Sequence, residues 1–200
     1  RVAHMLENLR IPGKEILAVS FTNKAAAEMN ERVRKLVPEA KVRRGLTMST
    51  FHSLGIRILR EDIHHIGYNN LFTIYDSADQ MSIIREALKN YRGGKSFDRG
   101  TIQSKISWLK NKGISPEEYS KSEFYDEENE YDGATESVYY FYQDKLRFYN
   151  ALDFDDILFL VVKLFEAHPD VARKYSERWK YLMVDEYQDT NGLQFRLIQG

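Results

Sequence analysis

Three short apolar segments predict the strands of a sheet. They are ILAVSF at residues 16–21, LTMSTF at residues 46–51 and YLMV at residues 181–184. None of them alternates between apolar and polar positions, which is typical of parallel strands that are covered on both faces. A helical pattern separates the first two segments, with one apolar face made of Ala26, Met29, Val33 and Leu36, and Pro38 ends it. This strand–helix–strand unit predicts a parallel sheet and an α/β fold.

About 130 residues between the second and third segments show helical patterns and no convincing strand, which predicts a separate helical subdomain. Ser77 to Gln80 has the spacing of a capping box and predicts a helix that Gly93 and Gly94 stop. Ser115 and Pro116, followed by glutamates, predict another helix start. Residues 153–165 are apolar nearly all round and predict a deeply packed helix. Segments 92–100 and 127–133 predict loops.

The first residues also have a helical pattern, because Val2, Met5, Leu6 and Leu9 are spaced as on one helix face. We expect this segment to be the end of a helix that begins upstream, and the chain to be a fragment. Its 200 residues, 42% hydrophobic and 30% charged, suffice for a sizeable core and exclude disorder along the whole chain. No apolar run is long enough to span a membrane, and no secretory signal opens the chain. The absence of cysteine excludes disulfides and thiolate zinc sites and fits a reducing compartment, so we expect a cytoplasmic protein.

Charge is distributed unevenly along the chain although the formal net charge is only −1. Residues 1–60 hold 12 Lys and Arg against 5 Asp and Glu, whereas residues 61–200 carry a net charge of −8. A basic segment of this kind indicates a polyanionic partner, although a solvated mixed-charge surface explains it equally well.

Two adjacent carboxylates, Asp185 and Glu186, follow the third predicted strand. Ligand sites of open α/β sheets lie beyond the carboxyl ends of the strands. An aspartate placed there can hold a hydrated Mg²⁺ that bridges nucleotide phosphates, and the glutamate can orient or deprotonate an attacking water. Polar residues at the point where a strand meets solvent are the alternative.

Four motifs together resemble the UvrD/Rep family of superfamily 1 ATP-dependent DNA helicases. VDEYQDTN at residues 184–191 is similar to the family's motif II, FTNKAAAEM at residues 21–29 to motif Ia, and STFH at residues 49–52 to motif Ib. LDFDD at residues 152–156 is similar to the short acidic motif that precedes motif II. Their order and spacing match Rep-like members over nearly the whole chain.

This resemblance implies a partial RecA-like P-loop NTPase sheet, domain 1A, formed by residues 1–55 and 153–200, with an inserted all-helical subdomain 1B at residues 56–152. It implies an ATP-dependent helicase that moves 3′ to 5′ on single-stranded DNA, acts at junctions of single and double strands in DNA repair or replication restart, and uses ATP and Mg²⁺. Asp185 would hold the Mg²⁺, Glu186 would activate the hydrolytic water and Gln188 would be linked to the nucleotide. The residues expected at the single-stranded DNA channel are Phe21, Thr22, Asn23, Lys24, Thr50, Phe51 and His52.

The residues of these motifs also allow plainer interpretations. An aromatic ring at a strand end can stack on any base, and a helix start offers donors to phosphate oxygens. Phe21 can equally be a core residue beside a capped helix, and His52 a half-buried histidine whose hydrogen bonds are satisfied. Three carboxylates, Asp153, Asp155 and Asp156, suggest a metal cluster, but capping of the following helix is favoured. Arg92, Lys95 and Arg99 are expected in a solvated linker rather than on a DNA backbone.

The sequence departs from an active helicase because it contains no GxxxxGK[ST] phosphate loop. Lys14 follows a glycine but precedes a glutamate, and Lys95 has no strand before it. We therefore expect the chain alone to hydrolyse no ATP and to unwind no DNA. Two alternatives remain open, namely a non-enzymatic module that binds single-stranded DNA or docks on a partner, and the motor part of a helicase–nuclease subunit.

Overall fold

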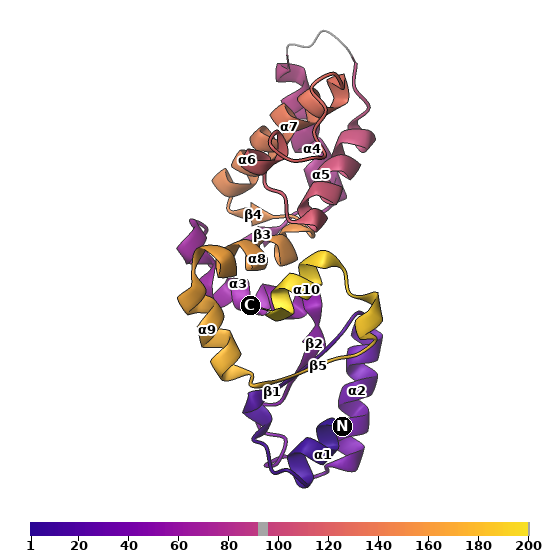
Figure 1. Cartoon of the computed structure of the whole chain (residues 1–200), viewed down its shortest axis with the longest axis vertical. Coiled ribbons are helices and arrows are strands. Elements are labelled where there is room, and N and C mark those ends of the chain that lie inside the picture. The colour runs from indigo at the N-terminus through magenta and orange to yellow at the C-terminus, as the bar shows by residue number, and fades with distance from the viewer. Residues whose placement is uncertain (92–95, 200) are drawn as a thin grey trace.

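The computed structural model describes residues 1–91 and 96–199 and shows an elongated molecule with an α/β part and a helical part (Figure 1). The α/β part contains a parallel sheet of three strands in the order β2–β1–β5. Their bounds are Thr47–Thr50 for β2, Ile16–Ser20 for β1 and Tyr181–Val184 for β5. This small parallel sheet confirms the predicted α/β class.

Helices cover both faces of the middle strand β1, which is buried at all five positions. Ile16 and Ala18 pack with Val33 on one face, beside α1 (Val2–Glu7) and α2 (Asn23–Leu36). Leu17 and Val19 pack on the other face in the main core. The helices on that side are α3 (Phe51–Asp62), α8 (Asp156–Ala167), α9 (Pro169–Arg178) and α10 (Gly192–Gln199). Short 3₁₀ turns span Gly13–Glu15, Ile63–Ile66 and Tyr187–Asp189.

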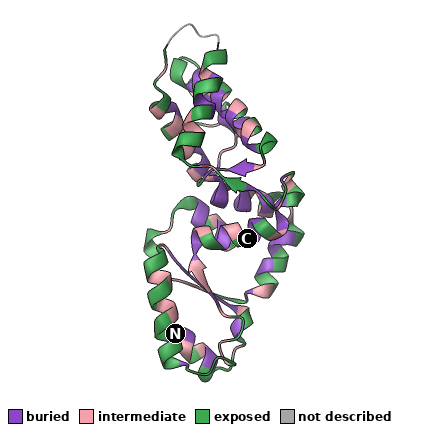
Figure 2. Cartoon of the chain, turned by 180° about the vertical axis from the view of Figure 1, so that it is seen from behind, coloured by how far each residue is buried: buried purple, intermediate pink, exposed green. Residues whose placement is uncertain are grey.

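The helical part forms a core of its own, separate from the core on the sheet. Its helices are α4 (Ser77–Asn90), α5 (Arg99–Lys112), α6 (Pro116–Tyr119) and α7 (Glu130–Phe148). Ile102, Ile106 and Leu109 are buried on α5, and the capping box of Ser115 and Glu118 begins α6 at the predicted helix start. Figure 2 shows buried residues in both parts. Within the described residues, no helix is long and apolar enough to cross a membrane.

The helix predicted over residues 153–165 is α8, and it joins the two parts. Eight of its residues, including Ile157 to Val162, are buried, because helices from both parts surround it. A pair of two-residue strands, β3 (Thr73–Ile74) and β4 (Ala151–Leu152), lies just before it in parallel register. This pair was not predicted, because a strand of two residues is too short to show an apolar or alternating pattern.

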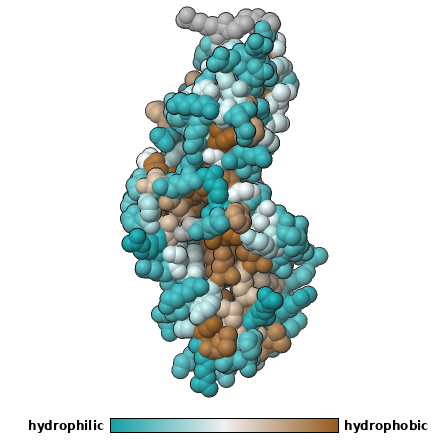
Figure 3. All heavy atoms as spheres, viewed as in Figure 1, coloured by the Kyte–Doolittle hydropathy of each residue, from teal (hydrophilic) through white to brown (hydrophobic). Residues whose placement is uncertain are grey.

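The structure corrects several predictions about individual residues. β5 is not covered on both faces: Tyr181 and Leu182 are 40% and 39% exposed, because β5 is an edge strand of the described sheet. Figure 3 shows apolar atoms gathered on this side of the α/β part. Leu36 is 65% exposed at the end of α2, and the adjacent Val37 is buried in its place.

One predicted helix start and one predicted loop are displaced. The capping box of α4 is formed by Asp76 and Asp79, one residue before the predicted Ser77 and Gln80, because the aspartate accepts bonds from the Ala78 and Asp79 amides. Loop residues predicted at 127–133 are helical from Glu130 onward, in α7. Gly93 and Gly94, like Arg92 and Lys95, lie outside the described residues.

Candidate functional site

Three of the four motifs meet at the carboxyl edge of the sheet. The strands are parallel, so the segments that follow them leave from the same edge. Residues 21–24 follow β1, residues 51–52 follow β2 and residues 185–189 follow β5. The register pairs Ser20 with Thr50, and Val19 with Val184. Segments far apart in sequence are thereby placed beside one another.

Asp185 and Glu186 lie in solvent at the end of β5. The Asp185 amide donates a hydrogen bond to the Val19 carbonyl at 2.9 Å and extends the β1–β5 pairing by one residue. Glu186 adopts a left-handed backbone conformation with φ 50° and ψ 46°, which is costly for a residue with a side chain. The chain then turns through Tyr187–Asp189, where Gln188 is also exposed. A strained turn therefore presents both carboxylates beyond the sheet.

These carboxylates suit Mg²⁺ by their chemistry. Mg²⁺ prefers oxygen ligands and keeps several waters, and proteins usually bind it through one or two carboxylates together with substrate phosphates. Solvent-exposed Asp185 at a strand end fits that mode. No group of three or more His, Asp or Glu side chains within residues 1–91 and 96–199 is arranged to hold a metal by itself.

Phe21 and the start of α2 form the second part of this edge. The Phe21 ring is partly buried against the main core and lies 5.4 Å from the Phe51 ring, at 53° to it. Thr22 caps α2 and accepts a hydrogen bond from the Ala25 amide at 3.1 Å. Thr22, Asn23 and Lys24 are exposed. A half-buried aromatic ring is thus followed by polar groups and free helix amides, which is suited to contact with bases and phosphates.

Burial restricts what the residues after β2 can contact. Thr50 is buried, and its hydroxyl caps α3 by accepting a bond from the Ser53 amide at 3.2 Å. Phe51 is 1% exposed, and its ring packs against that of Phe21. His52 is half-buried, and burial lowers its pKa more than the Asp155 carboxylate raises it. The imidazole is therefore neutral at pH 7.

Phe154 is a candidate that the sequence analysis missed. Its ring stacks on His52 with centroids 3.9 Å apart and planes inclined by 16°, and its side chain is 57% exposed. Its exposure could have been predicted from its position between acidic residues at a helix start, because such a turn leaves little apolar surface to bury the ring.

Two of the three carboxylates around Phe154, those of Asp153 and Asp156, cap α8 as favoured from the sequence, whereas the Asp155 side chain makes no capping hydrogen bond and accepts one from Asn111. Asp153 accepts a bond from the Asp156 amide at 2.8 Å, and Asp156 accepts one from the Asp153 amide at 3.1 Å. Lys110 from α5 lies 2.7 Å from a carboxylate oxygen of each. Lys110 is fully buried, which its position in a helix with polar neighbours does not indicate.

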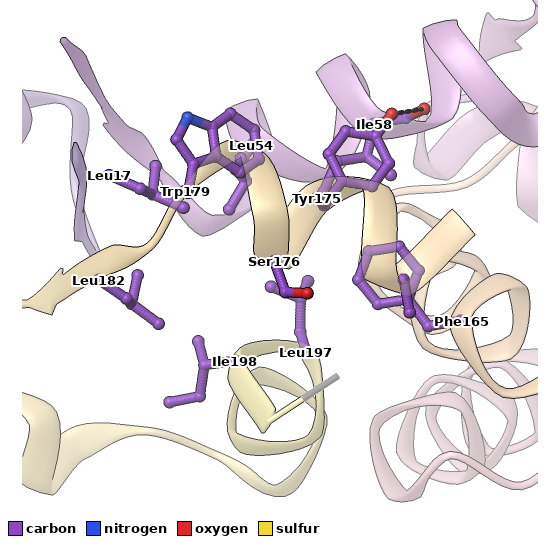
Figure 4. A pocket seen from close by; sticks show the side chains of 11 residues that line it. Leu17, Leu54, Ile58, Phe165, Tyr175, Ser176, Trp179, Leu182, Leu197 and Ile198 are labelled. Atoms are coloured by element: carbon purple, nitrogen blue, oxygen red, sulfur yellow. Dashed lines mark hydrogen bonds between the residues drawn. The ribbon is translucent and has the colours of Figure 1, made fainter. Parts of the chain in front are cut away.

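An apolar pocket of about 110 Å³, partly open to solvent, lies beside the main core and belongs to packing rather than to a nucleotide site. Figure 4 shows Tyr175 and Trp179 of the α9 region, with Leu182 of β5 and Leu197 of α10, around it. Its lining carries no charged side chain that could bind phosphates.

Comparisons with known proteins agree with the motif order. The family model described as the UvrD/REP helicase N-terminal domain matches residues 1–200. The ATP-dependent DNA helicase PcrA of Bacillus subtilis is 42% identical over 201 residues, which cover 100% of this chain and 26% of that protein. The PcrA of Staphylococcus aureus is 42% identical over 202 residues (100% and 27%), and that of Leuconostoc citreum 38% over 199 residues (99% and 26%). The chain spans about a quarter of the length of these relatives.

Proposed function

Since this chain belongs to the UvrD/REP helicase family, we propose that it is the part of an ATP-dependent DNA helicase that grips single-stranded DNA and supplies carboxylates for ATP hydrolysis. Residues 1–55 and 153–200 form the RecA-like domain 1A, and residues 56–152 form subdomain 1B. The longer protein moves 3′ to 5′ on a single strand and separates duplex at junctions, in DNA repair or replication restart in the cytoplasm. Family membership and the four motifs support this assignment.

One observation carries the proposal most directly: the Phe21 segment and the two carboxylates leave the same edge of the sheet on hydrogen-bonded strands. The Asp185 amide is bonded to Val19, only two residues before Phe21. A shift of the Asp185 segment on nucleotide binding would therefore move the DNA-contacting residues through one hydrogen bond and two residues of backbone. A translocating enzyme needs such a connection between its ATP and DNA sites.

For DNA, the exposed groups at this edge supply contacts that do not depend on sequence. The Phe21 and Phe154 rings stack on bases, while Thr22, Asn23 and Lys24 contact phosphates. His52 supports the Phe154 ring by stacking on it. Thr50 and Phe51, which have almost no exposed side chain, hold α3 and Phe21 in place rather than touching the strand.

For ATP, the chain's own residues bind and orient. Asp185 would hold the Mg²⁺, Glu186 would orient and deprotonate the attacking water, and Gln188 would be linked to the nucleotide. The metal supplies charge neutralisation at the phosphates when it is bound. Without a GxxxxGK[ST] loop in its sequence, this chain alone is expected to hydrolyse no ATP.

Binding of fluorescein-labelled oligothymidylate, followed by anisotropy at several salt concentrations, tests the DNA grip. We expect affinity to fall steeply with salt, and F21A and K24A each to weaken binding at least fivefold. K35A is the matched control for K24A, because Lys35 lies near the other end of α2 in an exposed pair with Glu31. Equal affinities of F21A, K24A and K35A would refute this site.

The same data address the two alternatives. Tight, salt-sensitive binding by the chain, together with no ATP hydrolysis by the longer protein with or without DNA, would favour a non-enzymatic binding module. A helicase–nuclease subunit would instead show nuclease activity outside residues 1–200.

A further inference from the structure

Side chains of the helical part hold every carboxylate of the turn that carries Phe154. Lys110 of α5 bridges Asp153 and Asp156 at 2.7 Å each. Its neighbour on α5, Asn111, donates to Asp155 at 2.9 Å. On α7, the Tyr142 hydroxyl donates to Asp153 at 2.8 Å and the Gln143 amide donates to Asp156 at 3.2 Å.

This cluster is buried where the two parts of the molecule join. Lys110 and Asp156 are 0% exposed, and Asp153 is 2% exposed. Two buried carboxylates this close repel each other unless a cation lies between them. Since Lys110 bonds to both, it fixes their separation and with it the backbone of the turn. Capping alone would leave the carboxylate pair without a cation.

The turn determines where the Phe154 ring lies. Phe154 follows Asp153 directly, and its ring is 57% exposed, whereas Lys110 is fully buried. The Phe154 ring stacks on His52, the second residue of α3. The ring therefore bridges a turn held by the helical part and a helix that begins at the sheet edge.

We propose that Lys110 is a positioning residue that sets the Phe154 ring against His52 and so builds one base-stacking surface of the DNA site from within the helical part. The contribution of Lys110 to DNA binding rests on the proposed function, whereas its control of the position of the Phe154 ring does not. The helical part thus contributes to the grip on the strand through a buried ion cluster and without touching the strand at this point.

The test uses a double variant that keeps the net charge of the cluster. K110M/D156N removes one cation and one carboxylate, and the asparagine oxygen still accepts the Asp153 amide. The readout is the NMR shift of the His52 ring protons, which the stacked Phe154 ring current displaces. F154L defines the shift without stacking. In K110M/D156N, we expect the His52 resonances to move most of the way to those of F154L.

A milder variant, N111A, removes the bond to Asp155, together with a bond to the Ser107 carbonyl within α5, and should move the His52 resonances in the same direction by less. K174M is the matched control, because Lys174 pairs with Asp62 at the other end of α3, about 15 Å along the helix from His52. It should leave the resonances unchanged. Wild-type resonances in both K110M/D156N and N111A would overturn the proposal.

Oligothymidylate binding then separates this inference from the proposed function. We expect K110M/D156N to bind about tenfold more weakly than wild type, and the addition of F154L to cause no further loss. Independent, additive losses would overturn the positioning role. If the wild-type chain binds no oligothymidylate, the proposed function fails, while the His52 resonances still decide the role of Lys110.

Discussion

Replacing Lys110 by methionine should strongly lower the free energy of unfolding of the chain. The methionine fills a similar volume but leaves Asp153 and Asp156 buried without the cation that lies 2.7 Å from each. Breaking a buried ion pair by removing one partner costs about 3–5 kcal/mol. For a chain of this size, about 2–4 °C per kcal/mol converts that loss to a fall in Tm of roughly 6–20 °C.

The stability loss caused by K110M should also depend on pH. Burial and the neighbouring Asp153 raise the pKa of Asp156 to about 6, although Lys110 opposes the rise. A carboxyl with a raised native pKa stabilises the fold fully below its unfolded pKa of about 3.9, and this contribution is lost as the pH rises through about 6. In K110M the opposing cation is gone, so the pKa rises further. The loss of unfolding free energy should therefore be larger at pH 8 than at pH 5.

Urea denaturation followed by circular dichroism at pH 5 and pH 8 measures both effects. K110M/D156N serves as the control, because it removes a carboxylate together with the lysine and should recover about half of the loss or more. A K110M variant within about 1 kcal/mol of wild type at pH 8, or a loss that shrinks as the pH rises, would refute the reasoning about this cluster.

Three further changes test other parts of the molecule. T22A removes the acceptor for the Ala25 amide and should lower the urea-unfolding free energy by about 1 kcal/mol, while T22S should restore it; equal stabilities would contradict the cap. F154A should weaken oligothymidylate binding by about 5- to 150-fold in anisotropy titrations, and F148A, which removes an 81% exposed ring of α7, should not; equal losses would argue against a specific stacking surface. G113A forces a side chain into a left-handed backbone with φ 79° at the end of α5, so it should lower the free energy of unfolding by about 1 kcal/mol and with it the Tm. An unchanged Tm would contradict this backbone conformation at Gly113.

The sheet and most helices were predictable because their signals are local. The uninterrupted apolar segment of β1 predicts burial on both faces, and β1 is buried throughout. Apolar positions all round α8 predict deep packing, which the structure confirms. The same kind of pattern misled at β5, because an apolar segment does not reveal that its strand lies at an edge.

The arrangement around Phe154 was not predictable, because it depends on contacts between residues far apart in sequence. Lys110 looks like an ordinary polar position of a helix, and its partners follow 43 and 46 residues later in the chain. The exposure of Phe154 and the burial of Phe51 are likewise properties of the packed molecule. The motifs correctly indicated the residues of the sheet edge, but not which of them reach solvent.

The proposed function is tested most directly by the ATP hydrolysis of a family-length protein that carries these 200 residues, measured with and without oligothymidylate. We expect DNA to stimulate hydrolysis, E186Q to abolish the stimulated rate while DNA binding persists, and F21A to weaken the stimulation by DNA. Hydrolysis that is indifferent to single-stranded DNA, or that survives E186Q, would contradict a DNA grip and a catalytic carboxylate at the same edge of one sheet.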